Sequence, residues 1–146
     1  MTDITQQELR LIVQDLHSEA EKTQLAQDLI AGTIDAAIYK NMCYQMWLIT
    51  DAIEYQVQNL DQQLTRRHQF IQDIVECPNS QVRTCPATHQ YVHYINNLYY
   101  PWTSGQLKGA MYTFYLGWLY GGQMIAKKLQ DLARFQAHAG NELALV

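Results

Sequence analysis

Residues 113–124 read TFYLGWLYGGQM and place three glycines inside a run that otherwise has the pattern of an apolar helix. A glycine inside a helix costs on the order of 1 kcal/mol relative to alanine, so Gly117, Gly121 and Gly122 weaken the element that contains them. Two arrangements explain their presence: a flat ligand that rests against the backbone, or a second helix that packs closely through small residues. The spacing of the glycines fits both arrangements.

The same run contains a G-x-x-x-G pattern, which pairs helices inside membranes. Polar residues flank it here, notably Gln123 and the Lys127–Lys128 pair, and the chain has no run of about 20 apolar residues. The N-terminus lacks the apolar segment of a secretion signal, and three cysteines are an odd number for a disulfide framework. We therefore expect a cytoplasmic protein without a membrane span; a bond between Cys77 and Cys85 stays open.

Helix boundaries can be predicted outward from the glycine run. Residues 5–8 match a capping box and are followed by apolar residues at helical spacing, which predicts a first helix over residues 5–31. Gly32 is a stop signal, and Thr33 or Asp35 can cap a second helix that ends near Leu64.

The remaining pieces are also helical in pattern. Residues 62–76 predict a third helical piece, continuous with the second or kinked from it. Pro86 can begin a short fourth helix that Pro101 stops, and the last helix is expected over residues 105–139. Because no strand alternation is present, we predict an all-α multi-helical bundle that forms a single domain over residues 1–146.

The charge of the chain limits its partners. The net charge is −4 and the basic residues form no block, which argues against a nucleic-acid surface. An anionic ligand would need local cations, and Arg10, Lys22 and the Lys127–Lys128 pair are available.

A polar stripe runs along the first predicted helix. Arg10, Gln14, His17 and Glu21 follow helical spacing beside the apolar face, so His17 is expected at the edge of a core. A neutral imidazole there can bind the iron of a flat macrocycle, and Arg10 can meet the carboxylates of that macrocycle. The alternative is a boundary histidine that only bonds to Glu21.

Two segments together resemble a known family. LHSEAE at residues 16–21 and YLGWLYGGQ at residues 115–123 resemble the two signature helices of heme oxygenases, in the same order and with a similar separation. Further similarity lies in Pro86-Ala87-Thr88, Tyr91-Val92 and Ile53-Glu54, so the resemblance covers most of the chain. In that family the first signature supplies the proximal histidine and the second forms the distal helix over the heme.

The resemblance implies a set of heme contacts by position. His17 would be the metal ligand, and Arg10 would replace a lysine that faces a heme propionate. Heme would be both cofactor and substrate, opened oxidatively to biliverdin with oxygen and an electron donor such as ferredoxin. The cofactor-binding positions implied are His17, Arg10, Tyr112, Thr113, Gly117 and Gly121.

Two substitutions depart from the family pattern. Trp118 stands where the family has a distal aspartate that organises water for oxygen activation, and Tyr120 replaces a small serine. Tryptophan offers one N–H donor and no carboxylate, so the resemblance assigns no catalytic residue here. Two functions follow: a heme-degrading oxidoreductase, or an inactive member of the fold that binds a tetrapyrrole or a protein partner.

Length is a further departure. The chain ends at Val146, whereas the usual heme oxygenase continues through more helices, so we expect a C-terminally shortened bundle. Missing helices would leave apolar surface exposed, and large exposed patches commonly become interfaces. The sequence therefore predicts a homodimer.

Three weaker patterns could bind metals. The dipeptides Cys77-Pro78 and Cys85-Pro86 resemble heme-regulatory motifs, although proline after cysteine also simply begins or ends a helix. His89 and His93 have the spacing of two ligands on one helix, with a surface position as the alternative. A di-iron site is disfavoured because no histidine has a glutamate three residues before it.

Overall fold

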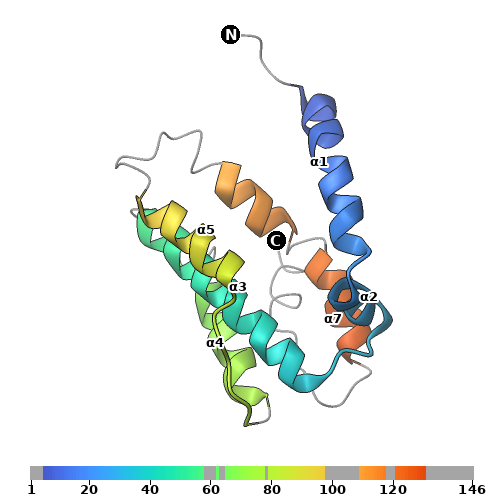
Figure 1. Ribbon diagram of the computed structural model, residues 1–146, viewed down its shortest axis with the longest axis vertical. Helices are drawn as coiled ribbons and strands as arrows, with labels where there is room; N and C mark the ends of the chain where they lie inside the picture. The colour runs from blue at the N-terminus through green and yellow to red at the C-terminus, as the bar shows by residue number, and fades with distance from the viewer. Residues whose placement is uncertain are drawn as a thin grey trace.

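The computed structural model describes residues 5–57, 62, 65–77, 79–97, 109–117 and 121–130. Within these ranges every regular element is a helix, which confirms the predicted all-α fold (Figure 1). None of the helices in the described ranges is long and apolar enough to cross a membrane. The elements are α1 (Gln6–Glu21), α2 (Gln24–Ala31), α3 (Ala36–Gln56), α4 (Arg67–Glu76), α5 (Pro86–Asn97), the π-helical η2 (Tyr112–Leu116) and α7 (Gln123–Gln130).

The first predicted helix is in fact two helices. The capping box at its start is confirmed, since the Glu8 amide donates to Thr5 Oγ1 at 3.3 Å and Glu8 Oε2 accepts from the Thr5 amide at 2.7 Å. The prediction of one helix over residues 5–31 is wrong, because Thr23 caps a new helix. Its hydroxyl donates to Ala20 O at 2.7 Å and accepts from the Ala26 amide at 3.3 Å. A threonine inside a helical pattern does not by itself predict the end of a helix. It ends one only where its hydroxyl bonds to neighbouring backbone groups, as here.

The start of α3 agrees with prediction and its end does not. Gly32 ends α2 in the left-handed region at φ 71°, and Asp35 Oδ1 caps α3 by accepting from the Ala37 amide at 2.8 Å. The predicted end near residue 64 is wrong, since α3 ends at Gln56 and α4 is a separate helix. The Arg66 amide donates to Glu54 Oε1 at 2.6 Å, so a contact distant in sequence holds the chain where it turns back.

The later helices agree with prediction in part. α5 begins at Pro86 as predicted. The described part of the last predicted helix contains η2 and α7, and it departs from α geometry through π turns at residues 112–116 and 121–122. Residues 105–108 and 131–139 of that prediction lie outside the described residues.

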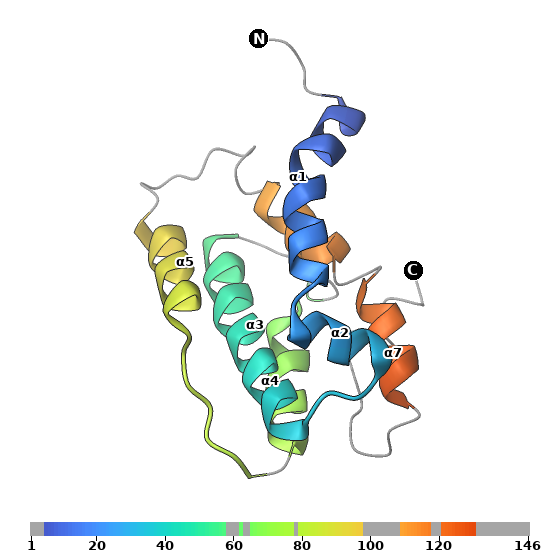
Figure 2. The ribbon, with the colours of Figure 1, turned by 45° about the vertical axis from the view of Figure 1, so that its right-hand side comes forward.

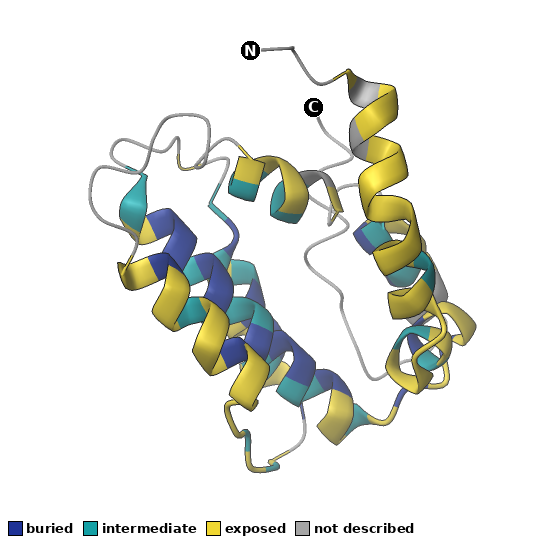
Figure 3. Cartoon of the chain, turned by 45° about the horizontal axis from the view of Figure 1, so that its top comes forward, coloured by how far each residue is buried: buried dark blue, intermediate teal, exposed yellow. Residues whose placement is uncertain are grey.

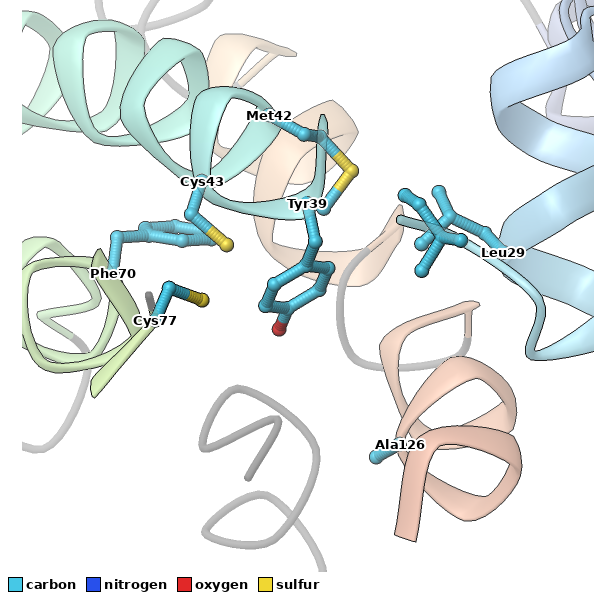
Figure 4. Packing of buried hydrophobic residues seen from close by; sticks show 8 residues of the cluster. Leu29, Tyr39, Met42, Cys43, Phe70, Cys77 and Ala126 are labelled. Carbon is cyan, nitrogen blue, oxygen red and sulfur yellow. The ribbon is translucent and has the colours of Figure 1, made fainter. Parts of the chain in front are cut away.

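α3 is the centre of the packed core. It contacts α4 along one side and α5 along another, as Figure 2 shows. One core cluster joins α3 to α2, α4 and α7 (Figure 4), and a second joins α3 to α5 and the helix around η2. The first cluster contains Leu29, Ile34, Tyr39, Met42, Cys43, Phe70, Cys77 and Ala126, and the second contains Ile49, Ala52, Ile53 and Ile95.

α1 stands apart from this core. Figure 3 shows its surface to be almost entirely exposed, and α2 is the helix that it contacts most in the described part of the chain. The exposed fractions of Ile12, Val13 and Leu16 are 63%, 51% and 73%. The apolar face of α1 is thus left open by the described residues.

Candidate functional site

A cleft lies between α3, η2 and α7. Its volume is about 230 Å³, and most of the side chains that line it are apolar. One wall comes from α3 and the others come from the glycine-containing run, so residues distant in sequence form the site together. The lining residues are Met46, Thr113, Phe114, Gly117, Gly121, Gly122 and Ile125.

Two of the three glycines that line this cleft, Gly117 and Gly121, face open space. A Cβ atom built on Gly117 or Gly121 would meet no heavy atom within 4 Å, counting the described residues. Gly117 has ordinary helical angles, with φ −57° and ψ −44°, so its backbone conformation does not require glycine. Close packing against another described helix therefore does not explain these glycines. π turns such as those at η2 occur frequently at functional sites.

The cleft offers few polar groups. Thr113 has the only polar side chain among its described lining residues, and its Oγ1 donates to Gly109 O at 3.0 Å. Tyr112 is 58% exposed and does not line the cleft. No ionisable side chain stands among the described lining residues, so the described walls carry no group for proton transfer.

The structure places His17 on the exposed surface of α1. Its side chain is 72% exposed, and its Nδ1 lies 3.5 Å from Glu21 Oε1. The expectation that His17 lies at a core edge is wrong, because the apolar face beside it is itself exposed. Arg10 is also exposed on α1. Of the sequence-predicted site residues, the structure brings Thr113, Gly117 and Gly121 together in the cleft and leaves His17, Arg10 and Tyr112 outside its lining. Trp118 and Tyr120 lie outside the described residues.

A buried carboxylate lies beneath η2. Glu54 is 7% exposed, and its Oε1 accepts from the Tyr115 hydroxyl at 2.7 Å and from the Arg66 amide at 2.6 Å. Its Oε2 lies 3.7 Å from Arg67 Nε, an ion-pair distance that is longer than a hydrogen bond. Burial, followed by the bond to Glu54, raises the pKa of Tyr115.

Sequence reasoning did not assign a role in the site to Glu54, Met46 or Phe114. Glu54 stood out only as part of the Ile53-Glu54 similarity to the family, because Thr50 and Asp51 make its side of the helix polar. Met46 and Phe114 gave no such signal, since they have the pattern of ordinary core residues. Their place in the cleft depends on how α3 meets η2.

The three cysteines are free thiols, so no bond joins Cys77 and Cys85. Cys43 and Cys77 lie in the core near Tyr39 (Figure 4), and burial raises the pKa of Cys77 to about 11. Cys85 is exposed just before α5. In the described ranges no three His, Cys, Asp or Glu side chains are grouped to hold a metal ion, which leaves the His89–His93 pair without a third ligand.

A comparison with known families gives one match. The model of the family described as heme oxygenase matches residues 4–145, nearly the whole chain. A comparison with curated individual proteins gives no match. Because the family match covers far more than half of the sequence, this chain belongs to the heme oxygenase family.

Proposed function

We propose that the protein binds heme, or a related tetrapyrrole, against the glycine wall of the cleft, with His17 as the axial ligand of the iron. The observation that carries this proposal is the open space over Gly117 and Gly121. A flat ring can approach a helix backbone closely only where side chains are missing.

The residues of the cleft fit such a ring. Met46, Phe114 and Ile125 offer an apolar surface of the kind that commonly binds large planar ligands. The volume of about 230 Å³ is smaller than the pockets of about 300–1,000 Å³ that enclose typical ligands. A tetrapyrrole would therefore rest one face and part of its edge on this wall and extend beyond the cleft.

α1 offers the other contacts that heme requires. The Nδ1 atom of His17 faces Glu21, which leaves Nε2 for the iron. A carboxylate at the far nitrogen fixes the tautomer and the orientation of a ligating imidazole. Arg10 lies seven residues before His17, about two helical turns away, where its guanidinium can pair with a propionate.

Heme supplies the iron at which members of this family use oxygen to open the ring to biliverdin. The residues of this chain would bind the ring, exclude water from its apolar face and orient the axial imidazole. The lack of an ionisable group among the described lining residues favours the binding role over ring opening. Trp118 in place of the family's aspartate points the same way.

A hemin titration tests the proposal. We expect a Soret band with wild-type protein and a shifted or weakened band with His17→Ala. His89→Ala is the matched control, because His89 is an exposed histidine on another helix. An absent band in wild type would overturn heme binding, and equal bands in wild type and His17→Ala would overturn the axial-ligand assignment. If heme binds, ascorbate or reduced ferredoxin in air distinguishes the two roles: biliverdin absorbance selects the oxygenase, and retained heme selects binding alone.

We also propose that the exposed apolar face of α1 pairs with a second copy to form a homodimer. Ile12, Val13 and Leu16 are each more than half exposed, and such surface is usually covered. Size-exclusion chromatography with light scattering should give a dimer for wild type and a monomer for Leu16→Glu. A wild-type monomer at micromolar concentration would refute the dimer.

A further inference from the structure

The π segment η2 is tied to α3 by a buried hydrogen bond. The Tyr115 hydroxyl donates a hydrogen bond to Glu54 Oε1 at 2.7 Å, and the two residues are 61 positions apart in the sequence. This is a bond to a carboxylate that is almost completely buried, so it is shorter and stronger than a neutral hydrogen bond at the surface. It joins the element that carries the cleft glycines to the centre of the core.

Glu54 itself is held in place from the other side. The Arg66 amide donates to the same oxygen at 2.6 Å, and Arg67 Nε approaches the second oxygen at 3.7 Å. Arg67 also bonds to Asp51 Oδ1 at 3.2 Å. These contacts hold the Glu54 carboxylate in place without Tyr115. Glu54 can therefore position Tyr115.

The neighbour of Tyr115 in sequence is the aromatic wall of the cleft. Phe114 lines the cleft on one side, and with Tyr115 it lines a small cavity of about 10 Å³ on the other side. Thr50, Arg66 and Phe70 line the rest of that cavity. A gap in the packing therefore lies next to Tyr115, between η2 and the residues of α3 and α4, so the bond to Glu54 adds a tie where side-chain packing is incomplete.

We propose that Glu54 is a positioning residue for the cleft, acting through Tyr115 to hold Phe114 and Gly117 where a flat ligand meets the wall. This proposal rests on the proposed heme binding. Buried carboxylates with partial ion pairs seldom add net stability compared with apolar residues, but they can specify one arrangement of neighbouring elements. The arrangement specified here is the π turn.

Two measurements test the proposal on the full chain: amide hydrogen exchange over residues 112–117 without ligand, and hemin affinity with the position of the Soret band. Tyr115→Phe removes the donor and keeps the ring. We expect exchange to be faster and hemin affinity lower, each by about tenfold, which corresponds to one hydrogen bond to a charged group. Tyr112→Phe is the matched control for the exchange measurement, because Tyr112 lies in the same segment but is 58% exposed.

Variants of Glu54 distinguish positioning from general packing. Glu54→Gln retains an acceptor oxygen for Tyr115 and Arg66 but makes both bonds neutral, so exchange and the Soret band should fall between wild type and Tyr115→Phe. Glu54→Leu removes the acceptor and should reproduce Tyr115→Phe. Equal exchange rates in Tyr115→Phe and Tyr112→Phe, or a Glu54→Gln variant that behaves like Glu54→Leu, would overturn the positioning role. If wild type binds no hemin, the proposed function fails, and the exchange rates still decide whether Glu54 holds the segment.

Discussion

α3 and α1 have the same kind of sequence pattern and opposite environments. Both carry apolar residues at helical spacing, yet Ile53 on α3 is 0% exposed whereas Leu16 on α1 is 73% exposed. α3 packs against α4 and α5, while the described part of the chain gives α1 little more than α2. Periodicity therefore identifies the face that can be buried, and the neighbours decide whether it is buried. An open face of this kind on a helix with a candidate iron ligand is available to a ligand or to a second copy.

The largest expected effect comes from comparing one substitution on each of the two helices. Ile53→Ala removes a fully buried side chain and should lower the free energy of unfolding by about 2–5 kcal/mol, through lost burial and a new cavity. Ile12→Ala makes the same chemical change where the side chain is 63% exposed in the single chain, and at a protein concentration low enough to keep the chain monomeric it should change stability by less than about 0.5 kcal/mol. Denaturant unfolding of the ligand-free protein measures both. Similar losses would show that α1 packs against the protein in solution.

A smaller difference is expected between two tyrosines of α3. The buried Tyr39 hydroxyl donates to Asp73 Oδ2 at 3.1 Å, so Tyr39→Phe removes a bond to a buried carboxylate and should cost about 1–3 kcal/mol. Tyr55 on the same helix is 81% exposed, and Tyr55→Phe should be neutral. Chemical unfolding of the two variants provides the measurement. A neutral Tyr39→Phe would mean that the hydroxyl adds nothing to the core.

The stability of the core around α3 should also depend on pH, because the core contains a buried thiol, Cys77. Burial raises the pKa of Cys77 from 9.0 to about 11, so the folded chain keeps this proton at a pH where the unfolded chain releases it. Stability from this group is complete below pH 9 and is lost as the pH rises toward 11.

Unfolding measured between pH 8 and pH 11 reports this loss as a slope. Cys77→Ala should flatten the slope, although other buried groups with raised pKa values contribute to what remains. Cys85→Ala changes an exposed thiol and should leave the slope as it is in wild type. An unchanged slope in Cys77→Ala would show that this thiol is not buried in solution.

Local signals predicted the helix ends that depend on local chemistry. The caps at Thr5, Gly32 and Asp35 follow from side chains or backbone freedom within a few residues, and the structure has each of them. The break at Thr23 and the end of α3 were missed. The break at Thr23 depends on which partners its hydroxyl takes, and α3 ends near the point where Glu54 accepts from the backbone amide of Arg66, the residue before α4.

The residues of the candidate site also fall into those that local sequence signals identify and those that depend on tertiary packing. Glycines inside a helical pattern have a local cost, so Gly117 and Gly121 could be identified from the sequence, and both line the cleft. Met46 and the bond from Tyr115 to Glu54 could not be identified, because they exist only once α3 and η2 are packed together. The position of His17 relative to the cleft could not be predicted either, because it depends on how α1 packs against the other helices. In the described part of the chain α1 makes few such contacts.

A small expected gain in stability tests the role of the open glycines. Gly117→Ala adds a methyl group in open space at helical backbone angles, so it should stabilise the ligand-free protein by about 0.4–1 kcal/mol. Hemin should bind this variant more weakly, because the methyl group stands where the ring would meet the backbone. Gly109→Ala is the matched control, since its Cβ is equally free and Gly109 does not line the cleft. Stabilisation of both variants with weaker hemin binding only in Gly117→Ala would show that the glycine is retained for the ligand at a cost to the helix. Equal hemin affinity in the two variants would mean that the ring does not rest on this wall.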